Sequence, residues 1–156
     1  MNFPVKCAVR QDMELIRPSF QDIYMKLALN ISRRSTCARL KVGCVITSTD
    51  HRYVYAVGYN GSAEGGPNDC DRHGDAAVGN CGCIHSEANA IINNTTERSK
   101  SKFVYCTTYP CVACSKMLIN LGGVQVVYYL HDYRVKESPN WLHEADIETQ
   151  QLQLEP

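Results

Sequence analysis

Apolar positions recur at intervals of three and four over residues 19–33, and this spacing predicts an amphipathic helix. Ser19 lies three residues before Asp22, a pair typical of a helix start. Two short apolar runs, 42–47 and 53–60, are separated by turn residues and predict an antiparallel hairpin. The apolar positions of the helix are Phe20, Ile23, Tyr24, Leu27, Ala28 and Ile31.

The second half of the chain alternates helical and strand patterns. The expected elements are a helix over 85–94, a strand over 103–108, a helix over 111–121, a strand over 124–130, and a short helix and weak strand after Trp141. Gly122 and Gly123 close the second of these helices at the usual C-terminal position. The order predicts a three-layer α/β/α fold with a mixed central sheet, residues 1–156 forming one domain.

The stretch from 61 to 82 is rich in Gly, Asn and Asp and predicts a long loop. Loops of this length in compact domains usually have a function or lack order. We expect the functional site where the two later helices begin at the ends of the strands, the usual position for ligands in open α/β sheets.

Composition narrows the classes of function. The chain has 156 residues, 44% of them apolar and 21% charged, as in an ordinary soluble domain. The net charge of zero disfavours a protein that binds polymeric nucleic acid and favours a small-molecule substrate. The sequence has no membrane-length apolar run and no signal-peptide core, so we expect a cytoplasmic protein. Nine cysteines in a reducing compartment then indicate metal ligands and buried thiols.

Metal-site chemistry is concentrated in His85-x-Glu87 and Pro110-Cys111-x-x-Cys114. One imidazole and two thiolates are ligands for a tetrahedral Zn²⁺ whose fourth position is left for water. Glu87 is then placed to carry a proton. This combination is the known signature of zinc-dependent nucleobase deaminases, in which zinc activates the water and the Glu is general acid and base. The alternative is a structural zinc site, which has no need for the carboxylate.

The spacing of these residues also predicts their local structure. Cys111 and Cys114 are three apart and therefore share one face of a helix, which Pro110 can begin. His85 and Glu87 are two apart and converge on one site only if His85 lies at a helix entrance. The sequence thus predicts two helices whose N-termini meet at one metal, and the helix dipole there favours thiolates.

Over roughly residues 19–134 the chain resembles the deoxycytidylate (dCMP) deaminases of the cytidine deaminase-like superfamily. Cytidine, guanine and tRNA adenosine deaminases share the zinc motif, whereas the Gly-Tyr-Asn-Gly segment and the loop after it favour the nucleotide branch. The matching segments are Ser35-x-Cys37-x-Arg39-x-x-Val42-Gly43-x-Val45-Ile46, Gly58-Tyr59-Asn60-Gly61, Asn68-x-Cys70, His85-x-Glu87-Ala88-Asn89-Ala90-Ile91 and Pro110-Cys111-x-x-Cys114.

The resemblance implies hydrolytic deamination of dCMP to dUMP, which supplies dTMP synthesis. Asn60 would hydrogen-bond the deoxyribose; its alternative is a turn-forming Asn beside Gly. The segment Asp132, Tyr133 and Arg134 would approach the substrate phosphate, and its alternative is a surface turn. The implied catalytic residues are His85, Cys111 and Cys114 on zinc and Glu87 as proton shuttle.

Many members of this family are allosteric hexamers, activated by dCTP and inhibited by dTTP with Mg²⁺. The resemblance therefore implies a homo-oligomer with an effector nucleotide bound by the loop over 58–66, whose glycines let backbone N–H groups approach phosphates. The basic stretch 33–41 would lie nearby; its alternative is a solvated helix end. The candidate effector residues are Gly58, Tyr59, Gly61, Gly65, Gly66 and Arg39.

Some members also carry a second, structural zinc, held by a cysteine at the position of Cys37, by thiols of the long loop and by a ligand just before the catalytic His. The candidates here are Cys37, Cys70, His73, Cys81 and Cys83, and the favoured set is Cys37, Cys70, His73 and Cys83. The alternative is a group of buried free thiols.

Other activities stay open at this point. They are a bifunctional dCMP and dCTP deaminase, a nucleoside deaminase and a tRNA deaminase, the last disfavoured by the zero net charge. A zinc-stabilised interaction module without catalysis is a separate class. It differs from the enzymes in having no function for Glu87.

Overall fold

The computed structural model describes residues 17–68, 70, 81–133 and 140–154. Five strands form one mixed sheet in the order β2-β1-β3-β4-β5. β1 is antiparallel to β2 and β3, whereas β3, β4 and β5 run parallel to one another. The strands are β1 Gly43–Ser48, β2 Val54–Tyr59, β3 Lys102–Thr108, β4 Val124–His131 and β5 Glu148–Gln151.

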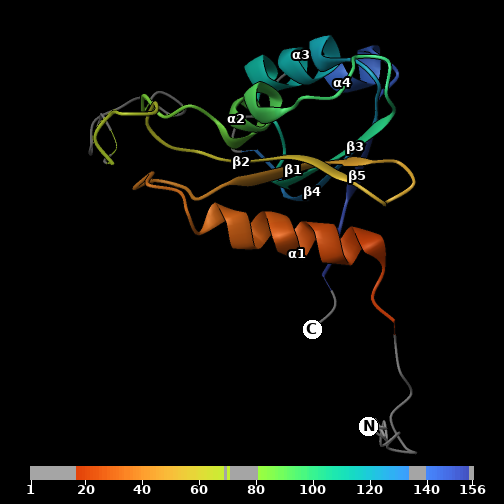
Figure 1. Cartoon of the computed structure of the whole chain (residues 1–156), viewed down its shortest axis with the longest axis horizontal. Helices are drawn as coiled ribbons and strands as arrows, with labels where there is room; N and C mark the ends of the chain where they lie inside the picture. Colours follow the sequence, from red (N-terminus) through yellow and green to blue (C-terminus); the bar gives the residue numbers. More distant parts are fainter. Residues whose placement is uncertain (1–16, 69, 71–80, 134–139, 155–156) are drawn as a thin grey trace, which may run out of the picture.

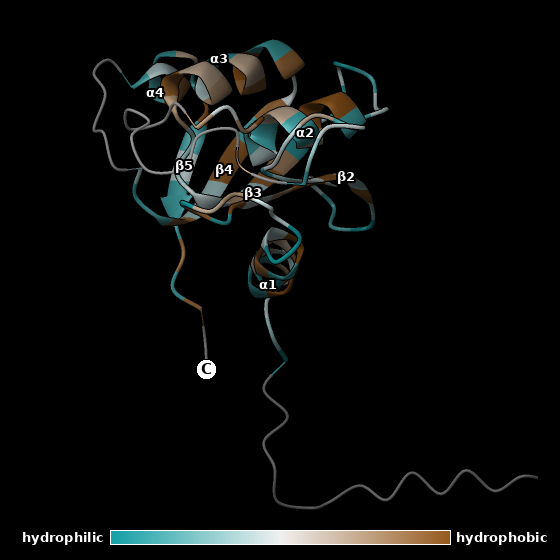
Figure 2. Ribbon diagram, turned by 90° about the vertical axis from the view of Figure 1, so that its left-hand side faces the viewer, coloured by the Kyte–Doolittle hydropathy of each residue, from teal (hydrophilic) through white to brown (hydrophobic). Residues whose placement is uncertain are grey.

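Helices cover both faces of the sheet. The helices are α1 Phe20–Ser32, α2 Ser86–Asn93, α3 Val112–Leu121 and α4 Trp141–Glu144. α1 lies alone on one face, and the other three lie on the opposite face (Figure 1). The perpendicular view shows the same three layers (Figure 2). The predicted α/β/α architecture with a mixed sheet is therefore confirmed. In the described part of the chain, no helix is long and apolar enough to cross a membrane.

Alternating residues of β1 divide the core into two halves. Val45 packs with α1, whereas Cys44 and Ile46 pack with the helices of the other face. All six residues of β1 are buried, as the apolar run predicted. β1 therefore contributes side chains to the cores on both faces of the sheet.

The first helix lies where it was predicted and buries Tyr24 and Ala28 of the expected apolar face, but the two first apolar positions of that face are exposed. Ser19 caps it, since its hydroxyl accepts a hydrogen bond from the Asp22 backbone N–H at 3.1 Å. Phe20 and Ile23 remain 46% and 44% exposed, although the three-and-four spacing places them on the apolar face. The residues that α1 buries are Asp22, Tyr24, Met25, Ala28 and Ser32.

Two glycines let helices approach the sheet closely. A Cβ on Gly43 would lie 2.0 Å from the carbonyl oxygen of Ala28 in α1. A Cβ on Gly58 would lie 2.2 Å from the carbonyl oxygen of Ser86 in α2. A side chain at either position would displace a helix, so Gly58 has a packing function that holds the start of α2 against β2.

A buried lysine joins the end of α3 to the loop before β3. The Lys102 ammonium donates hydrogen bonds to the carbonyl oxygens of Glu97 at 2.9 Å, Lys100 at 2.7 Å and Gly122 at 3.2 Å. Burial lowers the pKa of Lys102 below its usual value. The lysine thus ties the end of α3 to the loop that leads into β3.

We predict that Lys102→Met lowers the free energy of unfolding by about 2–3 kcal/mol, because three carbonyl oxygens lose a charged donor. Urea denaturation followed by circular dichroism measures the change. Lys100→Met is the matched control, since this side chain is exposed and should change stability by less than about 0.5 kcal/mol. Equal effects of the two substitutions would contradict this role for Lys102.

Candidate active site

The starts of α2 and α3 meet above the ends of the central strands. His85 is the N-cap of α2, with extended backbone angles of φ −70° and ψ 155°. Cys111 is the N-cap of α3, with φ −68° and ψ 168°. Cys114 lies in the first turn of α3, so the helix start holds both sulfurs on one side. His85 therefore has the helix-entrance position that the two-residue spacing to Glu87 requires.

These three side chains converge on one point. The His85 Nδ1 atom lies 3.4 Å from the Cys111 sulfur and 3.4 Å from the Cys114 sulfur. All three donor atoms lie within 4.8 Å of one another. One nitrogen and two sulfurs at this proximity fit zinc, and three protein ligands are the number found in catalytic zinc sites. His85, Cys111 and Cys114 would hold the metal.

The charges at this point suit a cation. The pKa of Cys111 is lowered to about 4, first by the hydrogen bond from Cys114 and further by His85. The pKa of Cys114 is raised, because it donates that hydrogen bond and because it is buried. The hydrogen bond to Cys111 raises the pKa of His85. A metal ion that replaces these shared protons would convert both thiols to thiolates.

Glu87 lies beside this cluster in the interior. Its side chain is only 4% exposed, and one carboxylate oxygen accepts a hydrogen bond from the Ser86 hydroxyl at 2.9 Å. Burial raises the pKa of Glu87, although the Ser86 hydrogen bond opposes the shift. A carboxyl group whose pKa is raised toward neutrality is suited to accept and donate a proton in one catalytic cycle.

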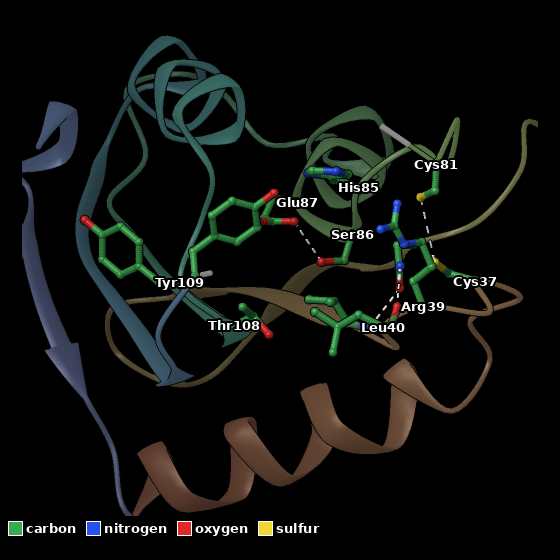
Figure 3. Close-up of a pocket in the computed structure, with 12 residues that line it drawn as sticks. Cys37, Arg39, Leu40, Cys81, His85, Ser86, Glu87, Thr108 and Tyr109 are labelled. Atoms are coloured by element: carbon green, nitrogen blue, oxygen red, sulfur yellow. Dashed lines mark hydrogen bonds between the residues drawn. The ribbon is translucent and has the colours of Figure 1, made fainter. Parts of the chain in front are cut away.

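One pocket is lined by His85 and Glu87 together with segments from the strand ends, and Cys111 and Cys114 are not among its lining residues. Its lining includes Cys37, Arg39, Leu40, Val42, Asn60, Cys81, His85, Ser86, Glu87, Thr108, Tyr109 and Tyr133 (Figure 3). Thr108 and Tyr109 directly precede Pro110 in sequence, and only this adjacency to the zinc motif could have indicated them. The Tyr109 hydroxyl donates a hydrogen bond to the Asn140 side chain at 2.9 Å, which connects the pocket to the start of α4.

Asn60 is buried and anchors the segment before β1. Its amide oxygen accepts a hydrogen bond from the Val42 backbone N–H at 2.8 Å. Its amide nitrogen donates to the Leu40 carbonyl oxygen at 2.7 Å. Asn60 therefore holds residues 40–42 in place and also lines the pocket, which a simple turn-forming Asn would not do.

The segment expected to approach the substrate phosphate lies only partly at this pocket. Tyr133 lines it, whereas Asp132 is exposed and is not among the lining residues. Arg134 lies outside the described residues. The pocket wall instead includes Arg39, which the sequence grouped with the effector loop.

A second, larger cavity of about 720 Å³ is lined by the loop after β2 and by α2. Its lining includes a short antiparallel bridge in which Gly61 and Ile84 exchange backbone hydrogen bonds of 3.1 and 2.8 Å. Arg34 and Thr36 also line this cavity. Five of the six candidate effector residues lie here, namely Gly58, Tyr59, Gly61, Gly65 and Gly66.

Four cysteines form a separate cluster. The sulfurs of Cys37, Cys70, Cys81 and Cys83 lie within 4.8 Å of one another. The sulfurs of Cys37 and Cys81 lie 3.9 Å apart, and those of Cys70 and Cys83 lie 3.7 Å apart. His73, which the favoured set included, lies outside the described residues, and Cys81 completes the described cluster. Four thiols at this distance are a donor set that structural zinc sites use.

Comparison with known proteins agrees with this geometry. The family profile described as the cytidine and deoxycytidylate deaminase zinc-binding region matches residues 18–130. The chain is 32% identical over 145 residues to the deoxycytidylate deaminase of Schizosaccharomyces pombe, covering 86% of this chain but only 44% of that protein. It is 33% identical over 124 residues to the deoxycytidylate deaminase of Mycobacterium phage D29, covering 72% of this chain and 95% of that protein.

Among solved structures, the fold resembles the dCMP deaminase from the cyanophage S-TIM5, crystallised in complex with dCMP and dUMP. The TM-score is 0.76 at 29% identity, covering 88% of this chain and 99% of that one. The family profile, over residues 18–130, includes the segments that carry His85, Cys111 and Cys114. The chain therefore belongs to the cytidine and deoxycytidylate deaminase family.

Proposed function

We propose that this chain is a zinc-dependent enzyme that converts dCMP and water to dUMP and ammonia. The observation that carries the proposal is the convergence of His85, Cys111 and Cys114 beside the buried carboxyl of Glu87. The resemblance to deoxycytidylate deaminases supports dCMP as the substrate. A zinc ion held by the three ligands supplies an activated water near neutral pH.

The chain's own residues account for the remaining steps. Glu87 accepts one proton from the attacking water and passes it to the ring nitrogen. It then takes the hydroxyl proton of the adduct and gives it to the amino group, so that ammonia leaves as the ring carbonyl forms. Asn60 positions the deoxyribose from its fixed place at the end of β2. The enclosed position of Glu87 keeps bulk water from competing for the proton.

Ammonia release from dCMP, dCTP, deoxycytidine and cytosine tests the proposal on the zinc-loaded protein. We expect dCMP to be the best substrate, and absence of turnover with dCMP would refute the assignment. Comparable turnover of dCTP would instead support a bifunctional deaminase. The same assay with tRNA and single-stranded DNA should give no product.

The large cavity supports regulation by a nucleotide. Its volume of about 720 Å³ lies in the range of ligand sites, and its glycine-rich wall suits a triphosphate with Mg²⁺. We infer that dCTP activates and dTTP with Mg²⁺ inhibits a homo-hexamer, as the family resemblance implies. Turnover measured with each nucleotide and sedimentation of the purified protein test the regulation and the assembly separately.

We also infer that residues 1–156 act as one deaminase domain in a reducing compartment, the cytoplasm. All eight described cysteines are free, which suits such a compartment. Several of these thiols lie close enough to pair, so their reduced state is needed if they are to bind metal.

The four-cysteine cluster supports a second, structural zinc held by Cys37, Cys70, Cys81 and Cys83. We predict two zinc ions per chain, and one in Cys70→Ser, because a serine hydroxyl stays protonated and cannot replace the thiolate. Metal analysis by inductively coupled plasma mass spectrometry measures the ratio. Cys44→Ala is the control, since this buried thiol belongs to neither cluster and both zincs should remain. A content of one zinc ion per wild-type chain would refute the prediction of a second site.

A further inference from the structure

Ser86 lies between the two functional residues at the start of α2. His85 is the N-cap, Ser86 is the first residue of the helix, and Glu87 follows it. The Ser86 side chain is completely buried and lines the catalytic pocket. The deaminase signature His-x-Glu specifies the residues on both sides of this position and leaves the position itself open. Ser86 is therefore a polar residue of the pocket to which the signature assigns no function.

We propose that Ser86 is a positioning residue, which holds the carboxyl group of Glu87 in the orientation needed for proton transfer. The inference rests on the proposed deamination, in which Glu87 carries the proton. It goes beyond the zinc motif, because it adds a residue that acts on the reaction through Glu87.

The contact between the two side chains carries the proposal. The Ser86 hydroxyl donates a buried hydrogen bond to the Glu87 Oε2 atom at 2.9 Å. Figure 3 shows the two side chains pointing toward one another, with this bond drawn as a dashed line. A donor on one carboxylate oxygen restricts rotation of the carboxyl group, and it thereby also fixes the direction of the other oxygen.

The length and burial of the glutamate make this restraint useful. A glutamate side chain has three rotatable bonds, and fixing them costs conformational entropy. Glu87 is only 4% exposed, so solvent contributes little to holding its carboxyl group. Since the Ser86 contact is part of the folded protein, this entropy is lost before the substrate binds. A misplacement of a catalytic group by about 1 Å can lower a rate by roughly 100-fold.

The backbone that carries Ser86 is fixed against the edge strand β2. A Cβ on Gly58 would lie 2.2 Å from the Ser86 carbonyl oxygen, so the helix start and the strand are in close contact. One turn further along α2, the Asn89 side chain donates to the Tyr59 carbonyl oxygen at 2.8 Å. The Asn89 backbone N–H donates to the His85 carbonyl oxygen at 3.0 Å. Ser86 therefore donates to Glu87 from a fixed position.

Ser86→Ala removes the hydroxyl and preserves the helix start, since alanine favours helices. We expect kcat for dCMP to fall by roughly 10-fold and KM to change by less than about threefold, because the geometry of proton transfer is altered and substrate binding is not. The zinc content should remain as in the wild type. Ser32→Ala is the matched control and should leave kcat unchanged. This buried serine donates to the Leu29 carbonyl oxygen at 2.7 Å in α1, on the opposite face of the sheet.

A double substitution separates the positioning of Glu87 from a general structural role. Glu87→Gln has no carboxyl group to carry the proton, so adding Ser86→Ala should lower its residual kcat by less than about twofold. A structural role would lower kcat by the same factor in both backgrounds and would overturn the inference. An unchanged kcat in Ser86→Ala, or the loss of zinc from this variant, would overturn it as well.

Isothermal titration calorimetry gives a readout without turnover. The probe is the 5′-monophosphate of the pyrimidin-2-one deoxynucleoside, which adds water at the carbon that bears the amino group in dCMP and so resembles the transition state. Ser86→Ala should bind this probe roughly 10-fold more weakly and should bind dUMP with less than about threefold change. Equal losses for the two ligands would contradict a positioning role. A wild-type protein that deaminates no dCMP would refute the proposed function itself, whereas an active wild type with an unaffected Ser86→Ala would refute only this inference.

Discussion

Glu87→Gln should lower kcat for dCMP by about 10²- to 10⁴-fold while the zinc content and the fold remain as in the wild type. Glutamine has nearly the same shape and can still accept the hydrogen bond that Ser86 donates to Glu87 at 2.9 Å. An amide cannot carry the proton from water to the ring nitrogen, so only the chemical step is affected. Steady-state ammonia release and metal analysis on the same preparation give the two readouts.

Glu97→Gln is the matched control, because this carboxylate is exposed and distant from the pocket lining. It should retain wild-type turnover. A Glu87→Gln protein that turns over dCMP at the wild-type rate would exclude Glu87 as the proton carrier. It would favour the alternative of a zinc-stabilised module in which this carboxyl is only a buried structural group.

Cys114→Ser should remove one zinc per chain and reduce turnover to the uncatalysed background. Serine keeps its proton near neutral pH and is a poor zinc ligand, so the remaining donors would be His85 and Cys111. Metal analysis and ammonia release measure both losses. Excess zinc should restore the turnover of wild-type protein that has been treated with a chelator, but it should not restore the turnover of Cys114→Ser.

Cys106→Ala is the control for the loss of a buried thiol, because Cys106 is buried like Cys114. The Cys106 sulfur lies 3.7 Å from that of Cys44 and is not one of the three converging ligands. This variant should keep its zinc and most of its activity, although the small cavity lowers stability. A Cys114→Ser protein that keeps full zinc and activity would contradict the ligand assignment.

The sequence predicted most of the architecture because local patterns and the fold agree in this chain. The alternation of Cys44, Val45 and Ile46 between two cores is the period of a buried strand, and Gly122, at φ 76°, ends α3 as a C-terminal glycine should. The two-residue spacing of His85 and Glu87 required a helix entrance, and the structure has His85 at that position.

Features that depend on tertiary contacts could not be predicted from the spacing of apolar and polar residues. Phe20 fits the apolar repeat of α1, yet it lies at the edge of the core, where its ring stacks on His51 at 4.7 Å. Periodicity gives the face of a helix but not how far the sheet extends beneath it. The apolar run of β3 likewise gave no reason to expect that Lys102 would be buried at its start.

The position of Arg34 and Arg39 at two different cavities was likewise not predictable from the sequence. The hydrogen bonds of Asn60 to Leu40 and Val42 fix the path of the chain before β1, and this path turns Arg39 toward the catalytic pocket. Such a contact joins residues about twenty positions apart. The family resemblance therefore placed Arg39 with the effector loop, whereas the structure has Arg34 at that cavity.

Anomalous diffraction at the zinc edge, from crystals of the zinc-loaded protein, is the decisive test of the metal site. We expect a zinc ion bonded to the Nδ1 atom of His85 and to the sulfurs of Cys111 and Cys114, with solvent as its fourth ligand. The absence of zinc at this point, or a fourth bond to a protein atom, would contradict it.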